Sequence, residues 1–180
     1  IDMGGGTSDI AILSLGDIVS SQSIRMAGDK MNSDIASYIK NKHGLVIGEH
    51  TAEKIKMELG TALRVDDPET MDVRGRDVAT GMPKQITVNE NEIEEALHDT
   101  LEQIVSAAVN VLETIPPELA SDIIDRGIML TGGTSLLKGV DQLFSARLKV
   151  PVVVSQDPLD NVAKGAGEML ERMQKTERKK

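Results

Sequence analysis

Residues 1–9 read Ile-Asp-Met-Gly-Gly-Gly-Thr-Ser-Asp, and this stretch points most directly to the fold of the chain. Three consecutive glycines follow the acidic Asp2 and precede Thr7 and a second acid, Asp9. Apolar-rich sequence continues over residues 10–15. The pattern predicts a tight turn between two strands, with a carboxylate on each side of the turn.

The glycine loop has the composition of a phosphate-binding turn. Glycine has no Cβ atom, so the backbone approaches a phosphate closely and adopts positive φ angles without strain. Asp2 would hold a water of a hydrated Mg²⁺, because Mg²⁺ keeps several waters and uses few protein carboxylates. Thr7 or Asp9 would orient a water or a phosphate oxygen. The N–H donors would come from Gly4, Gly5 and Gly6. Taken alone, the loop fits a hairpin turn with incidental acids equally well.

The position of this loop predicts that the chain is part of a longer protein. A loop of this kind needs a strand that leads into it. Only Ile1 precedes the motif here, so we expect the chain to begin inside a domain.

Composition narrows the function classes. The 180 residues are 39% hydrophobic and only 1% aromatic, so the core must consist of Ile, Leu, Val, Met and Ala. The formal net charge of −9 argues against general nucleic-acid binding, which requires a basic face. The absence of cysteine excludes disulfides and thiolate chemistry and suits a reducing cytosol.

Periodicity and turn residues predict alternating strands and helices. Strands are expected at residues 10–15 and 18–24 as a hairpin, then at 71–74, 85–88, 127–131 and 151–155, the last of them as a buried strand. Helices are expected at 29–43, 51–59, 90–115, 117–124, 136–148 and from 161 onward. The helix at 90–115 carries one apolar stripe, made of Ile93, Leu97, Leu101, Ile104, Ala108 and Leu112. The expected N-caps are Asp29, either Asn89 or Asn91, and Asp160. The last helix is expected to bury Val162, Ala166 and Leu170.

The order of these elements predicts an α/β core with a small inserted α+β subdomain. The core is expected at residues 1–28 and 89–175, and the insert at residues 29–88. Residues 176–180 form a charged tail. Its basic end, 178–180, is interpreted as a solvated helix end rather than a contact with anionic lipid.

A second glycine loop, Gly132-Gly133-Thr134-Ser135, lies between an apolar strand and a predicted helix. Ligands bind at such strand ends in α/β folds. Paired glycines there would let a flat ring lie against the backbone, and Leu136 and Leu137 would add apolar contact. The alternative is a plain strand-to-helix turn capped by Ser or Thr. Together, the two glycine loops indicate one nucleotide held from two sides.

Three motifs resemble those of the actin, sugar kinase and 70-kDa heat-shock ATPase superfamily, in the same order. Residues 2–9 resemble its second phosphate motif, and residues 130–139, Leu-Thr-Gly-Gly-Thr-Ser-Leu-Leu-Lys-Gly, resemble its adenosine motif. Residues 162–167, Val-Ala-Lys-Gly-Ala-Gly, resemble its second connecting helix. The resemblance implies an actin-like (ribonuclease H-like) ATPase fold.

Within this superfamily the chain is most similar to the MreB family of bacterial actins. The similarity is carried by residues 23–31, 47–56, 116–124 and 126–133 and extends through nearly the whole chain. It covers only the second half of the family's fold, the subdomains called IIA and IIB. The first phosphate loop and first connecting helix belong to the other half.

The resemblance implies a role for each motif position. Asp2 is similar to the carboxylate near the Mg²⁺ and the attacking water, and Asp9 to a second polar residue near that water. The implied β/γ-phosphate binders are Gly4, Gly5, Gly6 and Thr7. Gly28 and Asp29 match a glycine turn near the nucleotide, and the implied adenosine-side contacts are Glu53, Lys56, Gly132, Gly133, Leu136 and Leu137. Without the resemblance, Glu53 and Lys56 would be interpreted as part of a solvated helix face. Thr134 departs from the pattern, because many relatives have a third glycine there.

The resemblance also implies an activity and a setting. ATP with Mg²⁺ would be hydrolysed by in-line attack of water, coupled to self-assembly into filaments that organise cell shape and cell-wall synthesis. Partners would be membrane-associated, and the protein would lie in the cytoplasm at the inner face of the cell membrane, with membrane contact through the other half. The chain alone would bind ATP weakly and turn it over negligibly, because the cleft lies between the two halves.

Three alternatives remain at this point. A chaperone-type ATPase of the same superfamily shares the loops but has a longer insert. An actin-like adaptor would keep the fold without turnover, against which the intact Asp2, Thr7 and Asp9 argue. Half of a sugar or acetate kinase would need a substrate pocket that the sequence does not reveal.

Overall fold

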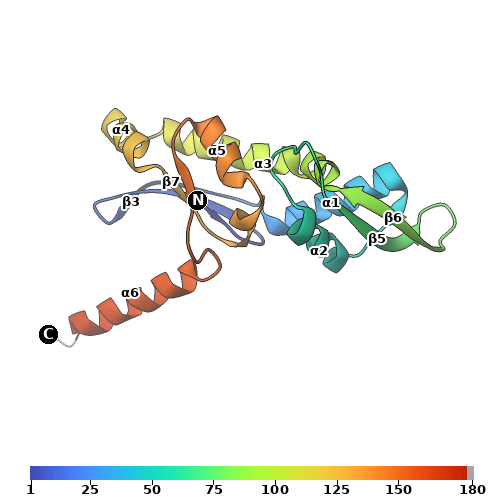
Figure 1. The fold of residues 1–180 in the computed structure, drawn as a ribbon. Helices are drawn as coiled ribbons and strands as arrows, with labels where there is room; N and C mark the ends of the chain where they lie inside the picture. Colours follow the sequence, from blue (N-terminus) through green and yellow to red (C-terminus); the bar gives the residue numbers. More distant parts are fainter. Residues whose placement is uncertain (178–180) are drawn as a thin grey trace.

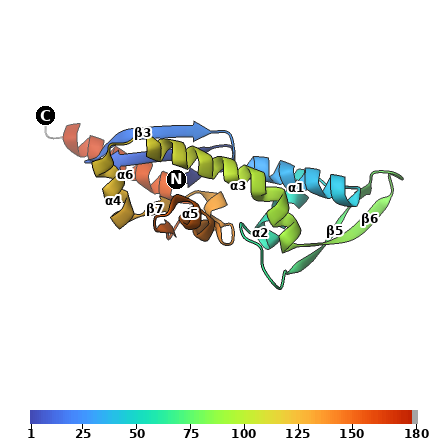
Figure 2. The ribbon, with the colours of Figure 1, turned by 90° about the horizontal axis from the view of Figure 1, so that it is seen from above.

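The computed structural model describes residues 1–177 and shows an elongated body. The strand β3 lies toward one end of the long axis, and the hairpin of β5 and β6 forms the other end (Figure 1). The long helix α3 runs between two regions of the body, one that contains β3 and one that contains the β5–β6 hairpin (Figures 1 and 2).

Helices and strands are mixed along the chain, which confirms the predicted α/β class. The strands are β1 (Asp2–Met3), β2 (Ser8–Ser14), β3 (Asp17–Ile24), β4 (Leu45–Val46), β5 (Thr70–Asp77), β6 (Pro83–Asn89), β7 (Ile128–Leu130) and β8 (Val152–Val154). The helices are α1 (Gly28–His43), α2 (Glu49–Leu59), α3 (Glu90–Glu113), α4 (Pro117–Arg126), the 3-10 helix η1 (Gly133–Leu136), α5 (Val140–Leu148) and α6 (Asn161–Glu177).

Backbone hydrogen bonds join the three-stranded sheet near the N-terminus to the two-stranded sheet of β7 and β8. Strands β1, β2 and β3 pair antiparallel in that order, and β7 pairs parallel with β8. A parallel bridge between Asp2 and Thr131 links β1 to the end of β7, with the Met3 N–H donating to the Thr131 carbonyl at 2.8 Å. The first glycine loop, after β1, is thereby placed next to the second, after β7.

The C-terminal part of helix α3 packs on the sheet of β1, β2 and β3, where Ala107, Ala108 and Val111 contact Ile10. The predicted stripe of α3 is buried at Ile93, Leu97, Leu101 and Ile104, as a 3.6-residue period requires for one helix face. The same core cluster includes Phe144 from α5. With one Phe and one Tyr in the chain, branched aliphatic side chains and Met fill most of the interior.

The predicted insert contains a separate sheet of β4, β5 and β6, of which the sequence predicted only β5 and β6. Strands β5 and β6 form the expected hairpin, and the two-residue strand β4, which was not predicted, pairs antiparallel with β5. The close approach of β4 to β5 depends on Gly75 in β5, because a Cβ atom there would lie 2.4 Å from the Val46 carbonyl oxygen. Helices α1 and α2 pack beside this sheet (Figure 1).

Two predicted helix starts are wrong. Asp29 is not an N-cap, because α1 already begins at Gly28 and Asp29 lies in its first turn. The amide N–H groups of Gly28 and Asp29 donate instead to backbone carbonyls of the glycine loop. The helix expected from residue 136 begins at Val140, because Gly139 has a left-handed φ of 71° that interrupts it.

The last two elements are more exposed than predicted. Val153 in β8 is 55% exposed, so this edge strand is not fully buried. In α6, Val162 is 65% and Leu170 60% exposed, and Ala166 is also exposed. Figure 1 shows the reason, since α6 projects away from the body. An amphipathic period predicts a stripe that can be buried, but it does not supply the partner surface.

The basic end of the predicted tail, residues 178–180, lies outside the described residues. Among residues 1–177, no helix has both the length and the apolar character needed to cross a membrane.

The N-terminus of α3 supports a stability prediction. Asn89 and Glu92 form a capping box, in which the Glu92 N–H donates to Asn89 Oδ1 at 3.1 Å and the Asn89 N–H donates to Glu92 Oε2 at 3.0 Å. Asn89→Ala should lower the free energy of unfolding by about 1 kcal/mol, measured by urea denaturation. The exposed Asn41→Ala in α1 is the control and should change it by less than about 0.5 kcal/mol. Equal effects of the two substitutions would contradict the capping role.

Candidate functional site

The first glycine loop connects β1 to β2 and is closed by its own backbone. The Gly4 N–H donates to the Thr7 carbonyl at 3.0 Å. Gly5, Gly6 and Thr7 are exposed, whereas Ser8 is buried and donates through its hydroxyl to the Met26 carbonyl. The loop is therefore fixed at its base and open at its tip, as a site for an external ligand requires.

The first turn of α1 is bonded directly to this loop. The Gly28 N–H donates to the Gly4 carbonyl at 3.1 Å, and the Asp29 N–H donates to the Gly5 carbonyl at 2.8 Å. A side chain at Gly28 would be crowded, because a Cβ atom there would lie 3.1 Å from Lys56 Nζ and 3.3 Å from the Thr134 hydroxyl oxygen. The predicted residues Gly28 and Asp29 thus lie beside the glycine loop.

The second glycine loop meets the first through Thr134. Its hydroxyl donates to the Gly4 carbonyl at 2.9 Å, across 130 positions of sequence. Gly132 has a φ of 82°, and a Cβ atom there would lie 2.4 Å from both Asp2 Oδ1 and the Met3 carbonyl oxygen. A third glycine at position 134 would remove the hydroxyl bond, so the departure from the family pattern has a structural role.

Lys56 brings α2 into the same place. Its Nζ donates to the Gly28 carbonyl at 3.1 Å, and its side chain is half-buried. Burial lowers the pKa of Lys56, while the carboxylates of Glu53 and Asp29 act in the opposite direction. Glu53 is exposed one turn earlier on the helix. The structure therefore places a partly desolvated cation next to the glycine loop.

The acidic residues of the motif remain close to the loop. The Thr7 hydroxyl donates to Asp9 Oδ2 at 2.9 Å, which orients both side chains. Asp2 is half-buried against Gly132. Within residues 1–177, no group of three or more His, Asp or Glu side chains could hold a metal ion. A cation here would take most of its ligands from water and a bound phosphate, which fits the coordination habits of Mg²⁺.

The structure separates the two predicted leucines. Leu136 is 58% exposed, and Gly133 next to it in the 3-10 helix is exposed too. Leu137 is 9% exposed and belongs to the core, where a Cβ atom on Gly60 would lie 2.6 Å from its Cδ1. Of the pair, only Leu136 offers an open apolar surface to a ligand.

Sequence reasoning missed two residues that shape the site. Thr134 was noted only as a departure, although its hydroxyl makes the bond between the loops. Lys138 was not singled out; its Nζ donates to Glu90 Oε1 at 2.6 Å. The only available signal for Lys138 was its place within the second motif, since its partner is 48 positions away.

A separate apolar hollow of about 430 Å³ lies away from the glycine loops. It is bounded by β2, the C-terminal part of α3, helix α4 and β7, with Ile12, Leu119 and Ile123 among its lining residues. It therefore does not belong to the cluster around Gly4.

The family of the chain follows from a match over nearly its whole length. The family model described as "MreB/Mbl protein" matches residues 1–178. The chain belongs to the MreB/Mbl family. The resemblance predicted from the sequence motifs is thus confirmed.

Individual MreB/Mbl relatives show how much of the family's length is present. The cell shape-determining protein Mbl of Bacillus subtilis (strain 168) is 52% identical over 180 residues, which are 100% of this chain and 54% of that protein. The cell shape-determining protein MreB of Escherichia coli (strain K12) is 48% identical over 171 residues, or 95% of this chain and 49% of that protein. The chain spans about half the length of the relatives it matches.

Solved structures confirm the predicted actin-like fold. MreB5 of Spiroplasma citri bound to AMPPNP superimposes with a TM-score of 0.95 and 35% identity, covering 99% of this chain and 54% of that one. A MamK double helical filament gives a TM-score of 0.77 at 19% identity, covering 94% of this chain and 53% of that one. The MamK likeness concerns the fold alone.

The contact between the two loops can be tested by substituting two glycines that both have a positive φ. Gly132→Ala should destabilise the chain more than Gly81→Ala. Gly81 shares a positive φ of 72°, but an added Cβ atom meets no atom within 4 Å there. An alanine at such a position carries about 1 to 3 kcal/mol of backbone strain. Gly132, with φ 82° and ψ 163°, lies in a region that is nearly restricted to glycine, and only Gly132→Ala adds a clash with Asp2 and Met3. Urea denaturation measures both, and equal losses would contradict the close contact.

Proposed function

We propose that the chain is part of an ATP-binding, ATP-hydrolysing filament protein that organises cell shape and cell-wall synthesis. The observation that carries the proposal is the Gly4 carbonyl, which accepts hydrogen bonds from Gly28 and Thr134 and so ties both glycine motifs to α1. Lys56 joins them through the Gly28 carbonyl. Three segments that are distant in sequence thus surround one exposed glycine loop.

The geometry supports a division of the site into a phosphate side and an adenosine side. The exposed loop, Gly4 to Thr7, would bind the β- and γ-phosphates through its backbone. Gly133 and Leu136 would form the platform for the ring, and Glu53 and Lys56 would face the ribose or adenine. The proposal draws support from MreB5 of Spiroplasma citri, which was solved bound to AMPPNP and to ADP at 35% identity to this chain.

Hydrolysis would depend mainly on positioning. When bound, Mg²⁺ would neutralise charge on the phosphate oxygens. Asp2, held against Gly132, would retain one of its waters. Asp9 accepts a hydrogen bond from the Thr7 hydroxyl, so this pair would orient the attacking water beside the γ-phosphate. The chain supplies one wall of the cleft, and turnover would require the remainder of a longer protein.

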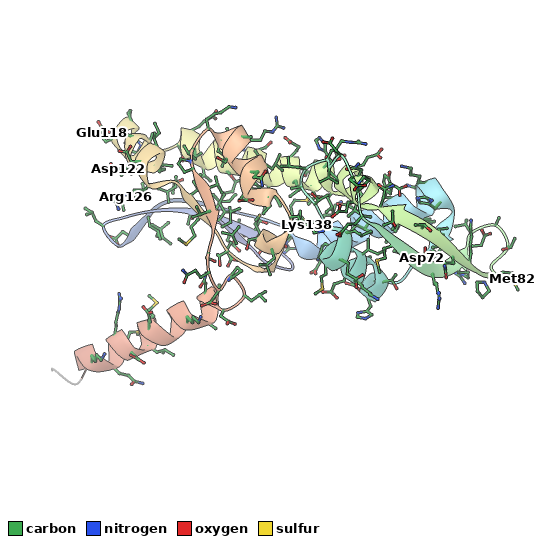
Figure 3. All side chains as sticks on the ribbon, in the orientation of Figure 1. Asp72, Met82, Glu118, Asp122, Arg126 and Lys138 are labelled. Atoms are coloured by element: carbon green, nitrogen blue, oxygen red, sulfur yellow. The ribbon has the colours of Figure 1, made fainter. Side chains whose placement is uncertain are left out.

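Self-association is proposed from the shape of the molecule and from the filaments formed by MamK. The exposed Val78 and Met82 lie in the turn of the β5–β6 hairpin, at one end of the body. The apolar hollow beside α4 lies toward the other end, where Figure 3 labels Glu118, Asp122 and Arg126. Apolar surface at opposite ends would support head-to-tail contacts between copies.

The proposed partners are membrane-associated cell-shape and wall-synthesis proteins. The protein would meet them in the cytoplasm, at the inner face of the cell membrane.

Nucleotide binding by the chain alone can be tested with ¹⁵N-labelled protein titrated with Mg-ATP. Amide shifts should concentrate in residues 4–7, 28–29 and 132–136, with weak affinity and negligible release of phosphate. Lys56→Met should weaken binding by roughly tenfold, because a charge-assisted hydrogen bond is lost near the ligand. Lys54→Met, exposed on the same helix and paired with Glu58, is the matched control and should bind as the parent does. Absent shifts, or turnover equal to that of a full-length relative, would refute the proposal.

Filament formation requires the full-length protein that we propose contains this chain. Adding Mg-ATP should convert it to sedimentable filaments. Asp2→Asn should slow phosphate release far more than it changes ATP affinity, because Asp2 would contact a water bound to Mg²⁺ rather than the nucleotide itself. Sedimentation and phosphate assays give the two readouts. A protein that binds ATP but neither hydrolyses it nor sediments would instead be the actin-like adaptor.

A further inference from the structure

An ion pair with one buried partner lies next to the adenosine side of the site. Lys138 Nζ donates to Glu90 Oε1 at 2.6 Å and to Glu69 Oε2 at 3.2 Å. Glu90 is only 5% exposed, whereas about half of the Lys138 side chain is exposed. The hydrogen bond from Lys138 lowers the pKa of Glu90 and raises the pKa of Lys138. A buried carboxylate of this kind depends strongly on its cation.

Glu90 is fixed from several directions and makes a firm anchor. It is the first residue of α3, where a carboxylate is favoured by the helix dipole. Its Oε2 accepts the Glu69 N–H at 3.0 Å, and its own N–H donates to the Glu69 carbonyl at 3.1 Å. Lys138 therefore connects to the point where β6 ends and α3 begins.

The backbone of Lys138 is bonded to the end of α2. Its carbonyl accepts the Ala62 N–H at 2.8 Å, its N–H donates to the Gly60 carbonyl at 3.4 Å, and it forms a parallel bridge with Thr61. Gly60 must be glycine, because a Cβ atom there would lie 2.1 Å from the Lys56 carbonyl oxygen. The end of the helix that carries Lys56 is thus held against Lys138.

On its other side, Lys138 is four residues from Thr134, which is bonded to the Gly4 carbonyl. The intervening turn is rigid, since the Leu137 N–H donates to the Thr134 carbonyl at 3.2 Å. Figure 3 labels Lys138 near the middle of the long axis, at the junction of the two regions.

We propose that Lys138 is a positioning residue whose side chain anchors the second glycine loop on Glu90 at the start of α3, together with the end of α2 that is bonded to the Lys138 backbone, so that Leu136 and α2 keep their places around one nucleoside. This rests on the proposed nucleotide site and assigns it a coupling to the region of residues 29–88. The first glycine loop also has anchors of its own, because the amides of Gly28 and Asp29 hold it directly, so phosphate binding should depend less on Lys138 than nucleoside binding does.

The experiment compares two ligands by ¹⁵N amide titration of the whole chain: Mg-ATP and inorganic magnesium tripolyphosphate. Lys138→Met should weaken ATP binding by about fivefold or more and change tripolyphosphate affinity by less than about twofold. Lys138→Arg should bind ATP nearly as tightly as the parent does, because it keeps a cation at Glu90. Lys84→Met removes a partly exposed cation paired with Asp77 at the far hairpin and is the matched control, expected to bind both ligands as the parent does.

A second variant separates positioning from loss of folding. Lys138→Met combined with Glu90→Gln leaves no uncompensated buried carboxylate, and the amide oxygen can still accept the Glu69 N–H. It should stay folded and show the same loss of ATP affinity. Unchanged ATP affinity in this variant, or equal loss of ATP and tripolyphosphate, would overturn the role of Lys138. A parent chain that binds neither ligand would overturn the proposed site itself, and the positioning role with it.

Discussion

The carbonyl oxygen of Gly4 accepts two hydrogen bonds, from the Gly28 N–H and from the Thr134 hydroxyl, and the site depends on this point. The first bond fixes the start of α1, and the second fixes the loop after β7. Both donors come from segments that are far from Gly4 in sequence. The close approach of the two glycine loops depends on Gly132, where a Cβ atom would lie 2.4 Å from the Met3 carbonyl oxygen.

The same constraint organises the electrostatics. Since α1 begins at the glycine loop, the Gly28 carbonyl is available to Lys56, and burial of that lysine lowers its pKa. Asp2, Asp9 and Asp29 surround the loop from other elements. The result is an exposed turn with donors at its base and carboxylates beside it, an arrangement suited to a phosphate bound together with a hydrated cation. Membership in the MreB/Mbl family agrees with this reading of the residues.

The two regions of the body meet at a junction that contains more than apolar packing. A backbone bridge joins Thr61 to Lys138, and the Lys138 side chain reaches the buried Glu90. Directional bonds fix a separation more narrowly than apolar contacts, because their strength falls steeply with distance and angle. Helix α6 differs in this respect: Asn161 anchors its start through Thr131 and Ser155, while its apolar stripe remains exposed.

The sequence by itself determined whatever depends on neighbouring residues. An asparagine before the apolar stripe signals a helix start, although Asn89 and Asn91 both remained open as the cap; the apolar spacing from Ile93 signals a buried helix face, and consecutive glycines signal a close backbone approach. Only the tertiary structure decided how these pieces face one another. Asp29 has the chemistry of a cap, yet carbonyls of the glycine loop satisfy the first amides of α1. Leu136 and Leu137 are identical in type, and packing against Gly60 buries only one of them. The partners of Thr134 and Lys138 lie 130 and 48 positions away, and local spacing carries no information about contacts at such separations.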